Sequence, residues 1–220
     1  MDLLRQIDSY CERLDPGYWA EPVNAVSNLA FLVAAYIMFR RVRGQGIPLA
    51  EVLCAILAVI GVGSYLFHTH ATVWSSILDV VPIAAFVLVY LFAANLHFWR
   101  MPLWAAFLGM AAFVPYAMAM TPVFARMTFF DVSAVYWPIP VLITLYSMAL
   151  RNRTPLTAHG LAIGSAILVV SLTFRSVDEP ICRALPIGTH FVWHLFNGLM
   201  LGWMIEVYRR HMIATAAASV

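Results

Sequence analysis

The chain alternates between long apolar stretches and short polar breaks. After the first 21 residues come seven mostly apolar windows, at Pro22–Phe39, Leu49–Phe67, Ile77–Phe98, Leu103–Met120, Val132–Leu150, Leu156–Phe174 and Gly188–Tyr208. Each is close to the roughly 20 residues that an α-helix needs to cross the hydrocarbon core of a bilayer. The pattern predicts an all-α integral membrane protein, built as a bundle of seven transmembrane helices.

The same pattern divides the chain into three parts. Residues 1–21 form a polar N-terminal segment, residues 22–210 a transmembrane domain, and residues 211–220 a C-terminal tail. The N-terminal segment lacks the charged start and apolar centre of a secretory signal, so the first apolar window is expected to remain as a span. Prolines at positions 115, 122, 138 and 140 predict kinks or breaks in the fourth and fifth helices.

Composition supports the bilayer as the solvent for this chain. Hydrophobic residues make up 63% of it and charged residues 11%, against roughly 25% charged residues in a soluble domain. So much apolar surface cannot be buried within one small soluble core. The thirteen Lys-or-Arg positions are all arginine, and no run of them lies beside exposed aromatic residues. No nucleic-acid partner is therefore predicted.

The arginines orient the helices, because cytoplasmic loops of membrane proteins are rich in basic residues. Eight lie on the side that holds the C-terminus, at positions 40, 41, 43, 100, 151, 153, 209 and 210, and five lie on the opposite side. This bias predicts a cytoplasmic C-terminus and an N-terminus outside. Eight of the eleven acids fall on the outer side. Acids do not orient membrane proteins, so their concentration indicates another role, such as a cation site.

Polar side chains within the spans are the candidate functional residues, because they are costly in hydrocarbon. They are Ser64, His68, Asp79, His190 and His194. His190 and His194 are four residues apart, so both imidazoles leave one face of a helix, and Ser64 and His68 repeat this spacing. The predicted topology brings His68, Asp79 and His190 to one level of the membrane, on the outer side.

Three histidines with one open coordination position are typical of a catalytic zinc site. Zinc would lower the pKa of bound water and polarise a carbonyl group. Asp79 could then transfer the water proton to a leaving group, and Ser64 could stabilise a developing oxyanion. For each histidine taken alone, a hydrogen bond to a neighbouring helix is the alternative.

The three cysteines fall into two groups. Cys54 lies within the second span and is expected to be a small packing residue. Cys11 and Cys182 lie on the predicted outer side, where they could form a disulfide if that compartment is oxidising, or remain two free thiols.

These residues resemble the signature of the alkaline ceramidases, which belong to a superfamily of membrane hydrolases that also includes adiponectin-receptor-like proteins. The resemblance rests on the stretch from Ser64 to His68, on Asp79, and on the stretch from His190 to His194. It covers almost the whole chain, because the order of the seven spans also agrees. It implies zinc ligation by the three histidines and hydrolysis of a lipid amide.

The N-terminal segment is similar to the calcium-binding segment of the ceramidases. The resemblance implies Ca²⁺ close to the zinc site, held by the side chains of Asp8, Glu12, Asp15 and Glu21 and by the backbone carbonyl of Tyr10. Four carboxylates are suitable calcium ligands, although the same acids could form a solvated surface. Their spacing departs from that of the eukaryotic enzymes. The resemblance also implies a disulfide between Cys11 and Cys182.

We therefore expect a zinc-dependent amidase that cleaves ceramide or a related long-chain N-acyl lipid to a fatty acid and a sphingoid-type amine. Small size and compact loops suggest a bacterial protein of the plasma membrane, with its active site towards the outer leaflet. One alternative keeps the fold but changes the substrate to another acyl lipid. Others are a membrane receptor with structural zinc, against which Asp79 argues, and a metal transporter, which would need ligands along the whole path.

Overall fold

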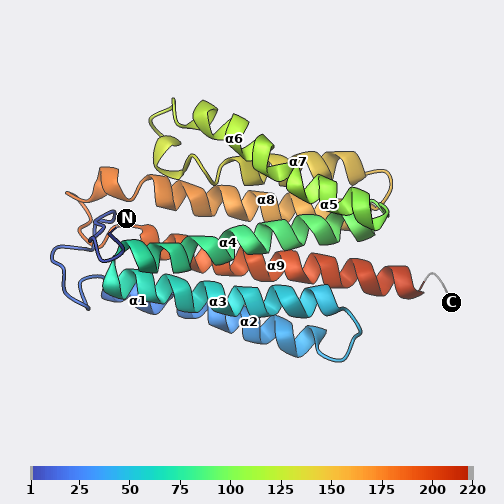
Figure 1. Cartoon of the computed structure of the whole chain (residues 1–220), viewed down its shortest axis with the longest axis horizontal. Coiled ribbons are helices and arrows are strands. Elements are labelled where there is room, and N and C mark those ends of the chain that lie inside the picture. Colours follow the sequence, from blue (N-terminus) through green and yellow to red (C-terminus); the bar gives the residue numbers. More distant parts are fainter. Residues whose placement is uncertain (1, 218–220) are drawn as a thin grey trace.

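The computed structural model describes residues 2–217, and its regular elements are helices (Figure 1). The α-helices are α1 (Pro22–Ser27), α2 (Leu29–Val42), α3 (Pro48–His70), α4 (Val73–Ala93), α5 (Leu103–Ala111), α6 (Phe113–Phe124), α7 (Pro138–Leu150), α8 (Pro155–Ser176) and α9 (His190–Ala217). A π-helical turn, η1 (Ala94–Phe98), continues α4, and two 3₁₀ turns are η2 (Asp131–Ser133) and η3 (Glu179–Ile181). The predicted all-α fold is confirmed.

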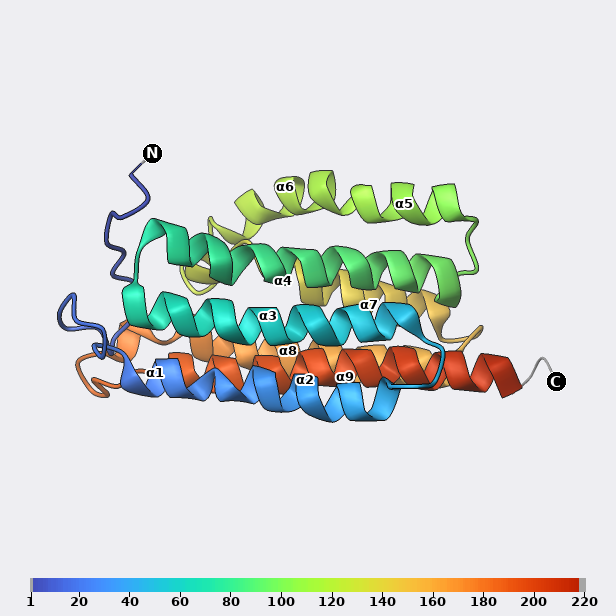
Figure 2. The ribbon, with the colours of Figure 1, turned by 60° about the horizontal axis from the view of Figure 1, so that its bottom comes forward.

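The long helices lie side by side along one axis, as both ribbon views show (Figures 1 and 2). Helix α9 packs against α2, α3 and α8. Helices α5 and α6 lie at the periphery, and α6 has no buried residue. The N-terminal segment, the end of α3 and the start of α9 gather at one end of the bundle, and the end of α9 lies at the other.

Five stretches are long and apolar enough to cross a membrane: Pro22–Val42, Pro48–His70, Val73–Phe98, Leu103–Phe124 and Pro155–Ser176. They correspond to five of the seven predicted windows, which supports a multi-pass membrane protein. The fifth window yields only the 13-residue helix α7, because the chain from Asp131 to Trp137 forms a 3₁₀ turn and further turns. The seventh window lies in α9, which is not among the five. Seven spans and the orientation of the termini stay predictions.

Prolines set several helix boundaries. Helices α1, α3, α7 and α8 each carry proline in the first turn, where the missing amide proton costs nothing. The fourth predicted helix is divided at Ala112 into α5 and α6, because Pro115 cannot donate a hydrogen bond to the carbonyl of Ala111. At the C-terminus, α9 continues to Ala217, so residues 211–217 of the predicted tail are helical, and residues 218–220 lie outside the described residues.

The N-terminal segment is attached to the bundle by backbone hydrogen bonds at the α3–α4 turn. Gln6 and Thr72 form an isolated antiparallel bridge, and the amide of Ile7 donates to the carbonyl of Ala71 at 2.7 Å. Ala71 has a positive φ of 45°, which ends α3 and reverses the chain. The segment therefore covers the end of the bundle at which the predicted site residues lie.

Candidate metal centre and catalytic cavity

Three histidines from two helices meet at this end of the bundle. His68 lies in the last turn of α3, and His190 and His194 lie in the first two turns of α9. One ligand atom from each lies within 4.8 Å of the other two. All three side chains are 1–2% exposed. The structure thus brings together the three residues that the sequence predicts as metal ligands.

The ring nitrogens of these histidines divide into paired and unpaired atoms. His68 Nδ1 is 2.6 Å from Glu21 Oε2, and His194 Nδ1 is 2.7 Å from Ser27 Oγ. His68 Nε2, His194 Nε2 and His190 Nδ1 are buried and have no hydrogen-bond partner within residues 2–217. A buried polar atom without a partner costs about 1–3 kcal/mol. A metal ion would satisfy the three nitrogens, while the paired nitrogens have the outer partners that metal-binding histidines usually have.

Asp178 fixes the start of α9, and therefore the position of His190. Its Oδ1 accepts hydrogen bonds from the amides of Thr189 at 2.6 Å and His190 at 2.8 Å. A carboxylate at this position satisfies free amides and interacts favourably with the helix dipole. Gly188 allows the approach, since its φ is +66° and a Cβ atom there would clash with Asp178.

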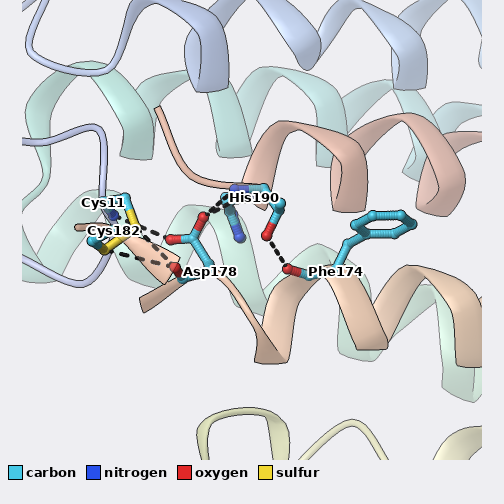
Figure 3. The surroundings of a disulfide bond; sticks show 6 residues. Cys11, Phe174, Asp178, Cys182 and His190 are labelled. Atoms are coloured by element: carbon cyan, nitrogen blue, oxygen red, sulfur yellow. Dashed lines mark hydrogen bonds between the residues drawn. A yellow bond between two sulfur atoms is a disulfide. The ribbon is translucent and has the colours of Figure 1, made fainter. Parts of the chain in front are cut away.

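A disulfide between Cys11 and Cys182 lies beside Asp178 (Figure 3). The amide of Cys11 donates to Asp178 Oδ2 at 3.1 Å, so one carboxylate joins the N-terminal segment to the first turn of α9. The predicted disulfide is confirmed. From the sequence, Asp178 is only one of the eight acids on the predicted outer side. The sequence signal for its role as a helix cap is its position in the loop that contains Cys182, shortly before the helix that carries His190 and His194.

Ser64 and Asp79 face the same small cavity as His190. The cavity has a volume of about 150 Å³. Gly63 and Leu78, the residues that precede Ser64 and Asp79, mark a close contact between α3 and α4, because a Cβ atom on Gly63 would clash with the carbonyl of Leu78. This contact brings α3 and α4 close together where Ser64 and Asp79 line the cavity.

Aromatic and basic side chains complete the cavity wall. The ring of Tyr10 stacks on that of His190, with centroids 3.7 Å apart. The Arg175 guanidinium lies 5.2 Å from the Tyr136 ring centroid and 5.9 Å from that of Trp193. It also donates to the carbonyl of Val132 at 2.7 Å. Neither Arg175 nor the Tyr10 ring is predicted from the sequence to belong to the site.

Among the acids predicted to hold calcium, no three bring carboxylate oxygens within 4.8 Å of one another in the described part of the chain. Glu12 accepts hydrogen bonds from the amides at the start of α1, at 2.7 and 2.8 Å, and Asp15 accepts one from the amide of Gly17 at 2.6 Å. Asp8 is exposed, and the carbonyl of Tyr10 accepts from the amide of Arg13. Within residues 2–217 the three histidines form the one group of His, Cys, Asp or Glu side chains suited to a metal ion. The structure therefore gives no support to the calcium site.

Glu21, the fifth predicted calcium ligand, is buried between Arg13 and His68. Its Oε1 lies 2.5 Å from Arg13 Nε, and its Oε2 lies 2.6 Å from His68 Nδ1. Burial alone would raise the pKa of the Glu21 carboxyl, but the hydrogen bonds from His68 and Arg13 and the charge of the guanidinium hold it below its ordinary value. Glu21 is thus an ionised partner of a candidate metal ligand.

Comparison with known proteins agrees with this geometry. The family model described as Ceramidase matches residues 9–217, nearly the whole chain. No curated protein matches the sequence. The match spans the three histidines, Ser64, Asp79 and both cysteines of the disulfide. The chain therefore belongs to the ceramidase family, and this membership implies an amidohydrolase that acts on the C–N amide bond of a lipid.

Proposed function

We propose that this protein is a zinc-dependent intramembrane amidase that cleaves ceramide or a related long-chain N-acyl lipid, releasing a fatty acid and a sphingoid-type amine. One observation carries the proposal. Three buried histidines meet beside a cavity that also holds a carboxylate and a hydroxyl group, and each has a buried ring nitrogen with no hydrogen-bond partner within residues 2–217. Imidazole is a common zinc ligand, and three protein ligands leave the open position that catalysis requires.

When bound, zinc supplies Lewis acidity for the amide carbonyl and lowers the pKa of water enough to provide hydroxide near neutral pH. Asp79 accepts the proton of the attacking water and returns it to the leaving nitrogen, as a general base and then a general acid. The Ser64 hydroxyl donates a hydrogen bond to the oxyanion that develops on the carbonyl oxygen. Glu21 and Ser27 keep His68 and His194 oriented through their Nδ1 atoms.

The shape of the cavity favours a lipid that is only partly enclosed. Its volume of about 150 Å³ is well below the roughly 300–1,000 Å³ of sites that enclose a drug-sized ligand. The cavity accommodates the reacting amide, and the acyl chain extends along apolar helix surfaces towards the bilayer.

For the placement in the membrane, we propose that α7 and α9 add two spans to the five long apolar stretches. The N-terminal segment and the metal centre then face the outer leaflet of a bacterial plasma membrane, and the arginine-rich end faces the cytoplasm. Support comes from the distribution of arginines and from the disulfide, which requires an oxidising compartment.

The test is hydrolysis of a panel of lipids by the purified protein in detergent micelles, with metal content measured on the same samples. The panel contains ceramides of several chain lengths, other N-acyl lipids, and an ester analogue of ceramide. We expect about one zinc per chain and release of fatty acid from ceramide, with both lost in His190→Ala. His159→Ala, a change in a histidine outside the candidate site, is the matched control.

Two outcomes would contradict the proposal. Zinc-loaded protein that cleaves only the ester analogue would reject amide substrates. Protein that cleaves ceramide with the same rate after its zinc has been removed would reject the metal mechanism.

A further inference from the structure

Arg13 is a buried cation within the N-terminal segment. It is 6% exposed, although arginine is rarely buried unless it is paired. Its Nε donates to Glu21 Oε1 at 2.5 Å, and its NH2 donates to the carbonyl of His68 at 3.1 Å. Its NH1 donates to the carbonyls of Asp15 at 3.1 Å and Gly17 at 3.5 Å. The guanidinium is thus surrounded by one carboxylate and three backbone carbonyl groups.

Such a set of oxygen atoms is also what Ca²⁺ binds, since its ligands are carboxylates, backbone carbonyls and water. Here the positive charge and the hydrogen-bond donors come from a side chain of the protein itself. Two further acids of the segment bind backbone amides in this arrangement, because Glu12 caps α1 and Asp15 binds the amide of Gly17, and Asp8 is exposed. A divalent cation among the same oxygens would lie against the guanidinium, and like charges at contact distance repel each other.

The guanidinium is connected to the metal centre through two routes that both end at His68. The first passes through Glu21, whose carboxylate binds Arg13 on one side and the Nδ1 atom of His68 on the other. The second is direct, from Arg13 to the backbone carbonyl of His68. That carbonyl lies in the last turn of α3, where the helix dipole favours a cation. Arg13 therefore contacts the groups that fix both the backbone and the ring of one metal ligand.

We propose that the Arg13 guanidinium takes the position of a structural cation in the N-terminal segment, so that the metal centre forms without calcium. Arg13 is in this view a positioning residue, which orients Glu21 and through it His68. The prediction that the protein binds no calcium does not depend on which lipid it cleaves. The effect on His68 rests on the proposed zinc site.

The experiment measures metal binding rather than hydrolysis. Protein is passed through calcium-free buffer, and zinc and calcium are determined by mass spectrometry. Thermal unfolding is then followed while CaCl₂ is added up to millimolar concentration. The wild type is expected to retain zinc, to hold no calcium, and to unfold at a temperature that calcium does not change. Stoichiometric calcium, or stabilisation that saturates with added calcium, would overturn the proposal.

The variants Arg13→Ala and Arg13→Lys test the positioning role. Loss of an outer partner of a metal ligand typically lowers metal affinity about 10- to 100-fold. We expect a loss in this range for Arg13→Ala. We expect a smaller loss for Arg13→Lys, which keeps the charge but cannot reach all four oxygens. Arg5→Ala removes an exposed arginine of the same segment and is the matched control. Unchanged zinc affinity in Arg13→Ala would refute the positioning role.

These readouts separate the inference from the proposed function. If the wild type binds zinc but cleaves no ceramide, the substrate assignment fails and the role of Arg13 stands on zinc affinity. If the wild type binds no zinc, the positioning of a metal ligand fails with the proposed function. The calcium titration still decides whether Arg13 excludes calcium.

Discussion

The two ends of the helical bundle both hold buried acids, but they use them differently. At the end opposite the histidines, Glu206 accepts hydrogen bonds from Arg209 at 2.8 Å and Arg210 at 2.7 Å, and Arg41 lies 3.6 Å away. All three arginines reach solvent. At the histidine end, Glu21 pairs with Arg13 and His68, and both partners are buried. His68 and His194 each keep one unpaired nitrogen, and so does His190.

This difference distinguishes a structural cluster of ion pairs at the Glu206 end from a candidate reactive site at the histidine end. The carboxylate of Glu206 is paired with Arg209 and Arg210, so its charge is balanced by neighbouring cations. At the other end, His68 and His194 are each hydrogen-bonded through Nδ1, and the three imidazoles offer ligand atoms within 4.8 Å of one another. Sixteen residues separate His190 from Glu206, about 24 Å along a helix. One helix thus carries both arrangements, and changes at its two ends should have separable effects.

The largest expected effect is that of Asp79→Asn. The amide keeps the size of the side chain but cannot accept a proton at neutral pH. We expect activity to fall about 10²- to 10⁴-fold, the usual contribution of a general acid–base, with zinc content unchanged. The measurement is hydrolysis rate and zinc content on one sample. Loss of zinc together with activity would instead make Asp79 part of the metal centre.

The next effect concerns stability. Cys11 and Cys182 are 171 residues apart in the sequence, and removing a native disulfide typically costs about 2–5 kcal/mol. We expect the double variant Cys11→Ser, Cys182→Ser to unfold at a lower temperature than the wild type. Reductant should lower the unfolding temperature of the wild type and leave that of the variant unchanged. Equal sensitivity of both proteins to reductant would show that the disulfide is not the cause.

A smaller effect is expected from Ser27→Ala, which removes the partner of His194 Nδ1. Zinc affinity should fall about tenfold, at the low end of the range for such partners, because the hydroxyl is neutral. Competition with a chromogenic chelator measures this. Ser147→Ala in α7 is the matched control, since its hydroxyl bonds a backbone carbonyl outside the site. A similar loss of affinity in both variants would point to a general loss of packing.

The smallest effect should come from the opposite end. Glu206→Gln leaves the arginines without a charged partner, but their exposure to solvent limits the loss to the order of 1 kcal/mol. Hydrolysis and zinc content should equal those of the wild type, while the unfolding temperature falls by a few degrees. Reduced zinc content in this variant would show that the two ends of α9 are coupled, against the comparison above.

The sequence predicted that the three histidines come together, but it did not predict which residues form hydrogen bonds with them. Spacing on a helix placed His190 beside His194, and the short turn after His68 returned Asp79 to the same level. The pairing of Glu21 with Arg13 depends on how the loop between them folds. A loop has no periodic sequence pattern from which its conformation can be predicted. The acids of this segment resembled a calcium site because their number is visible in the sequence and their hydrogen bonds are not.

In two of the predicted spans, apolar composition likewise hid features that the sequence does contain. Apolar composition marked Val132–Leu150 as a helix, yet the prolines at positions 138 and 140 favour a later start, and α7 begins at Pro138. Ser27, in the first predicted span, was not among the predicted site residues. Asn24, Ser27 and Asn28 recur at helical spacing in an apolar span, and such polar residues are functional candidates.

The position of the histidines along the chain has a consequence for biosynthesis. Chains are made from the N-terminus onward, and His190 and His194 belong to α9, the final helix of the described chain. Until α9 has been made, a nascent chain contains only His68 of the three histidines. Likewise, Cys11 cannot form its disulfide before Cys182 has been added. The disulfide can therefore form only after residue 182 has been made, and the three-histidine centre only after the start of α9 has been made. A ribosome that stalls before α9 yields a product that cannot assemble the three-histidine centre.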